Sequence, residues 1–301
     1  MQALVFWLAY PLLWLISILP FRLFYLVSDF ICFLVYRIFR YRRKTVTENL
    51  KLIFPEKPEP EILSIRRKFY SHMCDMFLEM IKSMSISSEE LKARFIFTNP
   101  EEIKRIEKLD KSLILMCGHY ASYEWMIALQ LYDVKYRAYG IYKKIKNPYF
   151  DDLVRKIRGR FEGILIPTVE ASRTIAANEK KGNNSIYDMI ADQSPKWSKS
   201  KFWTEFMNIE VPVFAGSEKL ARDFDMAVAY LHIEKVGRGR YHATLESITN
   251  SPREEPEFYV TKRFFEKLEN QIRTAPEYYL WTHKRWKHRN SAKPKNAVTF
   301  D

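Results

Sequence analysis

Cysteine is scarce in this sequence, and the motifs that hold metals or nucleotides are missing from it. The 301 residues include three cysteines, at positions 32, 74 and 117, and none of them forms a Cys-x-x-Cys pair. This pattern argues against a disulfide framework and against a zinc site, and a reducing compartment is its simplest explanation. There is also no glycine-rich phosphate loop and no internal repeat. We therefore expect neither a metal nor a cofactor.

Charge is missing from the start of the chain. The segment Met1–Phe21 carries no charged residue, and Asp29 is the only charge between residues 23 and 36. An uncharged run of this length approaches the roughly 20 residues that span a bilayer, although Pro11 and Pro20 interrupt it. A cleaved signal peptide is not expected, because no basic region precedes the run and no cleavage site follows it. Two possibilities remain: one tilted spanning helix, or a bent pair of helices partly in the interface.

A basic cluster follows this apolar region. It consists of Arg37, Arg40, Arg42, Arg43 and Lys44. Positive residues beside a membrane segment stay on the cytoplasmic side, so we expect the rest of the chain after Lys44 to lie on the cytoplasmic side too. Asp29 argues against a second full span, since an acid at mid-membrane costs about 2.5–3.5 kcal/mol. We predict an N-terminal membrane-anchoring helix with its basic flank at 1–44 and a single catalytic domain at 45–301.

The composition indicates a folded protein with anionic partners. Apolar residues make up 47% and aromatic residues 15% of the chain, which excludes a disordered protein. The formal net charge of +13 favours nucleic acid, anionic lipid, a phosphorylated substrate or an acidic protein as partner.

Strand and helix patterns alternate through most of the chain. We expect strands at 112–117, 136–142, 164–167 and 185–191, and helices from 61, from 99, and at 121–131, 147–157, 169–179, 217–224 and 257–273. A hairpin at 226–234 and 241–246, with its turn at Gly237-Arg238-Gly239, adds antiparallel strands. The pattern predicts an α/β fold with a mixed, largely parallel sheet flanked by helices.

The stretch Ser112–Trp125 carries the predicted chemistry. An apolar strand ends at Gly118, and His119 follows in the turn, at the edge where open α/β sheets bind ligands. His119 and Glu124 would lie roughly 140° apart on a continuous helix. They meet only if His119 lies in the turn and Glu124 in the first helical turn. Glu124 would then hold one imidazole nitrogen and leave the other free as a base.

Several short blocks occur in order along nearly the whole chain. They are Glu48-Asn49-Leu50, Phe54-Pro55-Glu56, Gly118-His119 through Glu124, Asn147-Pro148, Arg158-Gly159-Arg160, Asp192-Gln193, Val211-Pro212-Val213-Phe214 with Gly216, and Pro276-Glu277-Tyr278-Tyr279-Leu280-Trp281-Thr282-His283-Lys284-Arg285. With these blocks the chain resembles the late acyltransferases of lipid A biosynthesis, the lauroyl and myristoyl transferase family, among the His-x4-acid glycerolipid acyltransferases. It departs from many members at Pro167-Thr168, where they carry a basic residue, so the cation that orients the acceptor's phosphate is left open.

The resemblance implies a membrane-bound O-acyltransferase with a glycerolipid acyltransferase-like fold at the bacterial inner membrane, its catalytic domain on the cytoplasmic side. The donor would be an acyl carrier protein thioester, and the acceptor a hydroxyl of a lipid A precursor or a related glycolipid or phospholipid. His119 would take the proton of that hydroxyl, and Glu124 would fix the histidine tautomer and stabilise the imidazolium.

Five further residues are candidates for substrate binding: Lys143, Arg158, Arg160, Asp192 and Gln193. Arg158 and Arg160 flank a glycine at a helix end and could grip a lipid phosphate, or simply complement the helix dipole. Lys143 is a weaker candidate for substrate binding. Asp192, beside Gln193 at a strand end, could brace the site's arginines or form a structural ion pair. His283 is interpreted as packing or membrane-surface support.

Two other functions are compatible with the sequence. The basic, aromatic tail Trp281–Arg289 could belong to a nucleic-acid-binding or lipid-binding membrane protein without catalysis. The apolar N-terminus favours lipid, and no nucleic acid is expected. An acyl esterase could use the same His/Glu pair, but the chain lacks a Gly-x-Ser-x-Gly nucleophile motif.

Overall fold

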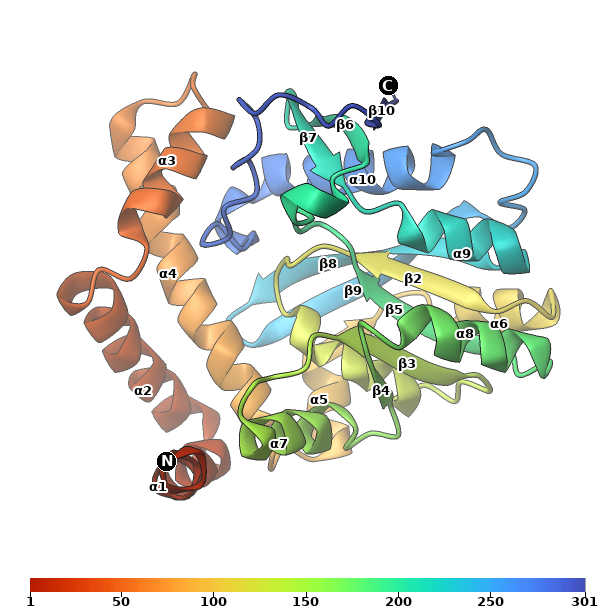
Figure 1. Ribbon diagram of the computed structural model, residues 1–301. Helices are drawn as coiled ribbons and strands as arrows, with labels where there is room; N and C mark the ends of the chain where they lie inside the picture. The colour runs from red at the N-terminus through yellow and green to blue at the C-terminus, as the bar shows by residue number, and fades with distance from the viewer. Residues whose placement is uncertain (301) are drawn as a thin grey trace.

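The computed structural model describes residues 1–300, with helices packed around a twisted sheet (Figure 1). The α-helices are α1 Gln2–Ile18, α2 Phe21–Phe33, α3 Arg43–Ile53, α4 Glu59–Lys82, α5 Ser88–Arg94, α6 Glu101–Lys108, α7 Pro148–Arg158, α8 Ala171–Lys180, α9 Gly216–Phe224 and α10 Tyr259–Thr274. Four further helices are not α-helices: the π-helix η1 Leu34–Ile38 and the 3-10 helices η2 Tyr123–Leu131, η3 Trp197–Lys199 and η4 Pro276–Tyr278. The strands are β1 Phe95–Phe97, β2 Leu113–Cys117, β3 Arg137–Tyr142, β4 Ile164–Pro167, β5 Ser185–Ile190, β6 Phe202–Phe206, β7 Ile209–Val213, β8 Ala227–Gly237, β9 Arg240–Thr249 and β10 Val298–Thr299.

Seven strands form the main sheet, in the order β1-β9-β8-β2-β5-β3-β4. Only the β8–β9 hairpin pairs antiparallel, and every other neighbouring pair is parallel. The predicted mixed sheet flanked by helices is therefore confirmed. All five residues of β2 are buried, since this strand has a neighbour on each side and helices over both faces. That environment explains why its sequence is a continuous apolar run.

A second sheet, of three strands in the order β10-β6-β7, was not predicted. Its hairpin turns at Met207 and Asn208, which both have positive φ (59° and 58°). Such a turn matches the twist of a hairpin but is usually marked by Asn-Gly or Asp-Gly. Because no glycine stands there, the sequence pattern gave no turn signal.

The helix expected at 121–131 is shorter and tighter than predicted. The chain first turns at Ala121, which has a φ of 49°, and then continues as the 3-10 helix η2. Six of the nine residues of η2 are buried, so this segment has no solvent face to give it an amphipathic pattern.

The apolar N-terminus forms two helices that meet at Pro20. Phe6 of α1 packs on Tyr149 and Phe150 of α7, and α2 packs along α4. No helix among residues 1–300 combines the length with the apolar character that a membrane span requires. The expected transmembrane helix is therefore not supported, and the chain forms a bent pair of helices, α1 and α2, instead. Pro20 explains the break, because the residue before a proline is restricted to extended backbone, and Leu19 has a ψ of 140°. Pro11, in contrast, is accommodated inside α1.

Asp29 forms an ion pair with another residue of the protein. Arg238, in the β8–β9 turn, donates to Asp29 Oδ1 at 2.6 Å and to Asp75 of α4 at 2.8 Å. Ser28 also donates to Asp75, at 2.7 Å. These contacts join α2 to the sheet. The division of the chain at residue 44 stays a prediction.

Lys82 ties α1 to the end of α4, and this contact can be tested. Its buried ammonium group donates at 2.7 Å to the carbonyl oxygens of Ser17 and Leu19, beside the break at Pro20. Lys82→Met keeps the aliphatic stem but removes both bonds. We expect a loss of about 1.5–3 kcal/mol in the free energy of unfolding, measured by chemical denaturation.

The matched control is Lys92→Met. The exposed Lys92 donates to the carbonyl oxygen of Leu131 at 3.2 Å, and its replacement should cost less than about 0.5 kcal/mol. Equal losses in the two variants would contradict the role of Lys82 in docking α1.

Candidate active site

His119 and Asp192 meet at the carboxyl ends of two neighbouring parallel strands. Cys117, the last residue of β2, pairs in register with Ile190, the last residue of β5. His119 and Asp192 each follow two residues later. Asp192 Oδ1 lies 2.6 Å from His119 Nδ1 and accepts a second hydrogen bond from the His119 backbone N–H at 3.2 Å. One buried carboxylate oxygen thus fixes both the ring and the backbone of His119.

The contact determines the protonation of both groups. Burial alone would lower the pKa of His119, but the charge and hydrogen bond of Asp192 outweigh burial and raise that pKa above its usual value. Burial would likewise raise the pKa of Asp192, but its contacts with His119 and the charge of Arg285 lower it. Asp192 is therefore ionised, and an ionised carboxylate only accepts hydrogen bonds. Nδ1 of His119 carries the proton, and Nε2 is left as the basic nitrogen.

Gln193 and Tyr123 enclose the other side of the imidazole ring. The Gln193 side-chain nitrogen lies 3.1 Å from His119 Nε2, within donating distance of its lone pair. The Tyr123 ring meets the imidazole edge to face, with 5.0 Å between ring centroids. His119 keeps 17% of its side chain exposed, so Nε2 lies at the boundary between protein and solvent.

Glu124 binds Arg158 rather than His119. Arg158, the last residue of α7, donates from Nε to Oε2 at 2.8 Å and from Nη2 to Oε1 at 2.6 Å. This is a two-pronged pair in which the Glu124 side chain is almost fully buried. The predicted contact between His119 and Glu124 is therefore wrong, because the turn at Ala121 and the tight η2 helix direct Glu124 toward α7. The charge of Glu124 still raises the pKa of His119, and that of Arg158 lowers it, so the two pairs lie close together.

The other predicted site residues have different surroundings. Arg160 donates to the carbonyl oxygen of Ser83 at 2.8 Å. Lys143 is exposed just after β3. The prediction that Asp192 braces the site's arginines is wrong for Arg158 and Arg160, since Asp192 is used by His119 and Arg158 by Glu124.

The segment after α10 supports the turn that carries His119. The Leu280 N–H donates to the carbonyl oxygen of His119 at 3.1 Å, and the Ala121 N–H donates to that of Tyr278 at 3.0 Å. Two bonds from one segment thus hold the turn on both sides of Tyr120. This segment resembles the acyltransferase family in sequence, but its contact with the turn that carries His119 was not predicted.

Two residues of the same segment lie near Asp192. His283 had been interpreted as packing or membrane-surface support, and Arg285 was missed as a site residue. Arg285 is fully buried and donates to Ser194 Oγ at 3.0 Å and to the Pro212 carbonyl oxygen at 3.1 Å. His283 Nε2 accepts from the Ser194 N–H at 3.3 Å, and burial lowers the pKa of His283 to about 4. His283 is thus a neutral group that holds the loop after Asp192. An arginine two residues after a histidine, within the basic and aromatic stretch Trp281–Arg289, was the available signal.

The chain matches known proteins over nearly all of its length. The family model described as bacterial lipid A biosynthesis acyltransferase matches residues 1–288. A lipid A biosynthesis lauroyltransferase from Escherichia coli (strain K12) is 25% identical over 291 residues, which cover 96% of this chain and 93% of the relative. Lipid A biosynthesis acyltransferase 2 from Shigella flexneri is 21% identical over 263 residues, covering 85% of this chain and 81% of that protein.

The pairing of Asp192 with His119 predicts how the imidazole titrates. Asp192→Asn removes the charge that raises the pKa of His119 and leaves burial, which lowers it. We expect the pKa of His119 to lie above about 6.5 in the unmodified protein and to fall in Asp192→Asn. The measurement is a proton NMR titration, with the His119 signal assigned by its loss in His119→Gln. A pKa that stays unchanged in Asp192→Asn would refute the pairing.

Proposed function

Because the chain belongs to the bacterial lipid A biosynthesis acyltransferase family, we propose that it transfers a fatty acyl group from an acyl carrier protein thioester to a hydroxyl of a lipid A precursor or a related membrane lipid. The family makes the chain an O-acyltransferase. One observation above all supports the reaction: His119 has its Nδ1 held by a buried carboxylate, while its side chain stays partly exposed to solvent.

In the proposed mechanism His119 Nε2 takes the proton of the acceptor hydroxyl. The hydroxyl oxygen forms a bond to the thioester carbonyl carbon, and the carbonyl electrons move onto oxygen. The C–S bond then breaks, and the leaving thiolate takes the proton from the imidazolium. Asp192 stabilises the imidazolium between these steps, because it holds Nδ1–H at 2.6 Å and is itself ionised. No covalent acyl-enzyme is required, since the thioester is already activated.

Arg158 is the proposed partner of the oxyanion. Glu124 engages its Nε and Nη2 and thereby fixes the plane of the guanidinium group. The Nη1 group remains to donate toward the negative charge that develops on the carbonyl oxygen. Glu124 then acts by positioning Arg158, and not as the orienting acid of the histidine.

The donor and acceptor contacts follow from charge. A protein with a net charge of +13 suits the acidic surface of an acyl carrier protein. Gln193, beside Nε2, is proposed to contact the acceptor hydroxyl. Lys143 and Arg160 stay proposed contacts to anionic groups of the substrates, Lys143 because it is exposed and Arg160 because one nitrogen only is bound to Ser83.

We also propose that the N-terminal helices attach the enzyme to the cytoplasmic face of the bacterial inner membrane. Large apolar side chains are exposed along α1 and α2: Leu4, Val5, Trp7, Leu8, Leu12, Trp14, Leu15, Ile18, Leu23, Leu26, Phe30 and Phe33. An apolar face of this extent on adjacent helices fits insertion into the headgroup region, with the basic residues of 37–44 next to anionic lipids.

The first test of the mechanism is the loss of the base. His119→Ala should lower the acyl transfer rate by about 10²–10⁴ while leaving the fold intact, because proton abstraction contributes that much. Transfer is measured from an acyl carrier protein thioester to a lipid A precursor, and thioester hydrolysis without acceptor is the control for esterase activity. Full transfer by His119→Ala would exclude the mechanism.

The second test asks which residues act as units. Double-mutant cycles should show strong coupling between His119→Ala and Asp192→Asn and between Glu124→Gln and Arg158→Gln, since each pair is in direct contact. The cross pair of His119→Ala with Glu124→Gln should be closer to additive. Strong coupling in the cross pair alone would favour the direct histidine–glutamate contact instead.

The third test concerns membrane attachment. Leu8→Glu with Leu12→Glu places two charges on the exposed face of α1, where both leucines are more than half exposed. The variant should lose most of its co-sedimentation with phospholipid vesicles. Val169→Glu with Leu109→Glu, at exposed positions outside α1 and α2, is the charge-matched control. Unchanged sedimentation of the α1 variant would rule out this face as the attachment site.

A further inference from the structure

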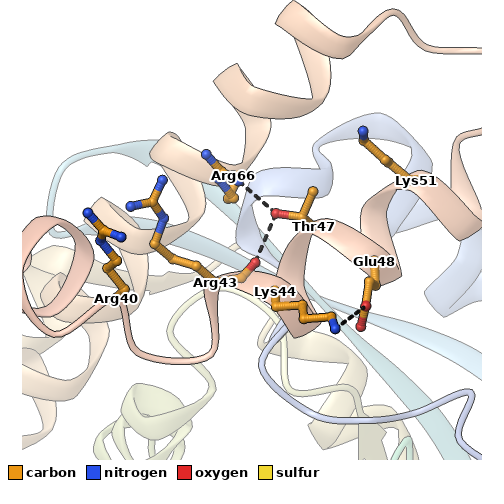
Figure 2. A pocket seen from close by; sticks show the side chains of 7 residues that line it. All are labelled: Arg40, Arg43, Lys44, Thr47, Glu48, Lys51 and Arg66. Carbon is orange, nitrogen blue, oxygen red and sulfur yellow. Dashed lines mark hydrogen bonds and ion pairs between the residues drawn. The ribbon is translucent and has the colours of Figure 1, made fainter.

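Both arginines first expected to bind an anionic group also have partners within the protein, whereas a second group of cations has few such partners. Arg158 pairs with Glu124, and Arg160 donates to Ser83. A separate open pocket of about 720 Å³ lies where η1, α3 and α4 meet (Figure 2). Its lining residues are Arg40, Arg43, Lys44, Thr47, Glu48, Lys51 and Arg66.

The charge of this pocket is poorly compensated. Five cations face one carboxylate, that of Glu48, and its only ion pair is with Lys44 at 3.8 Å between two exposed groups. Lys51 pairs with Glu59 at 3.0 Å, also at the surface. Exposed pairs of this kind contribute little. Within residues 1–300 the three arginines of the pocket have no carboxylate partner, and Figure 2 shows their guanidinium groups in a row.

Two of these arginines are held in place by neutral groups. Arg43 and Arg66 both lie over the ring of Tyr36, at 4.8 and 5.7 Å from its centre. Arg66 also donates to Thr47 Oγ1 at 2.7 Å and to the Tyr36 hydroxyl at 3.2 Å, and its buried Nε has no partner. Guanidinium groups that are fixed close together without an anion repel each other. A phosphate, which accepts several N–H donors at once, would offset this repulsion.

An apolar cavity of about 530 Å³ has no lining residue in common with the basic pocket, but the two meet along the chain at residues 39–41. Phe39 and Tyr41 line the cavity, while Arg40 between them lines the pocket. The rest of the cavity comes from α2, η1 and α4 and from two residues after α10, Leu280 and Thr282. Leu280 is the residue whose N–H binds the carbonyl oxygen of His119, so the cavity reaches the segment that supports the catalytic turn.

We propose that the basic pocket binds the phosphate of the acceptor lipid, with one of its hydrocarbon chains in the adjoining apolar cavity. Along residues 39–41 the apolar cavity, the basic pocket and the apolar cavity again are lined in turn, which matches a lipid with a charged head group beside a hydrocarbon chain. A soluble phosphate compound would leave the apolar cavity empty. The lipid class is therefore a phosphorylated amphiphile. This inference rests on the proposed function, because it assigns the bound lipid to the acceptor side of the reaction.

The test compares two triple variants that remove the same charge. Arg40→Gln with Arg43→Gln and Arg66→Gln empties the pocket of its guanidinium groups. Arg173→Gln with Lys180→Gln and Lys181→Gln, at exposed positions on and just after α8, is the control. Acyl transfer is measured in neutral detergent micelles with a lipid A precursor and with the same lipid after phosphatase treatment.

We expect the pocket variant to raise the KM for the phosphorylated lipid on the order of tenfold to a hundredfold. The KM for the thioester donor should change less than twofold, as should both constants in the control variant. With the phosphatase-treated lipid, the pocket variant and the unmodified protein should differ little. Arg40→Glu repeats the test at a single exposed side chain, in case the triple variant does not fold.

Each contrary outcome has a distinct meaning. An unchanged KM for the phosphorylated lipid in a folded variant overturns the inference and leaves the proposed function intact. Reduced binding to phosphatidylglycerol vesicles, with that KM unchanged, also overturns it and marks the pocket as a membrane contact. If the unmodified protein transfers no acyl group, the proposed function fails. The inference is then judged by direct binding in neutral micelles. The phosphorylated and the phosphatase-treated lipid are each bound to His119→Ala and to His119→Ala that also carries the three pocket substitutions.

Discussion

The hydrogen bond between Asp192 and His119 is the contact on which the arrangement of the site depends. It requires that β2 and β5 be adjacent, parallel and in register at Cys117 and Ile190, since a one-residue slip of either strand would turn its side chain away from the other. An ionised carboxylate that is almost fully buried is costly unless it is paired. Asp192 is paired twice with His119, so the sheet, the ionisation of Asp192 and the tautomer of His119 stabilise one another.

The C-terminal segment makes this arrangement rigid. It contacts the histidine turn through Leu280, while Asn49 of α3 donates to the carbonyl oxygens of Trp281 and His283, both at 2.9 Å. The segment therefore connects the catalytic turn to the helix that lines the basic pocket. The link consists of the Asn49 side chain at one end and the Leu280 backbone N–H at the other.

Local features of this protein could be predicted from sequence, and distant partners could not. The strand at 112–117 and the turn with His119 are marked by an apolar run, a glycine and a polar residue in immediate succession. Glu124 was assigned to His119 because it is near in sequence. Its real partner, Arg158, lies 34 residues away, and Asp192 lies 73 residues from His119. Both pairings depend on which strands and helices become neighbours, and one sequence contains no direct signal for that. The N-terminal apolar run likewise predicted helices, but their packing on α4 and α7 was needed to show that they bend.

Charge balance explains why this set of residues suits acyl transfer. With His119 neutral, the negative charge of Asp192 is matched by the buried Arg285, and that of Glu124 by Arg158. Proton transfer to His119 adds one positive charge to this balanced set. In the proposed reaction a negative charge appears on the carbonyl oxygen at the same time, close to Arg158. The tetrahedral intermediate therefore leaves the site neutral overall, whereas a protonated His119 without substrate leaves a positive charge uncompensated. Because a low-dielectric site penalises unbalanced charge, the oxyanion adds to the stabilisation that Asp192 already gives the imidazolium in the free protein, where it raises the pKa of His119.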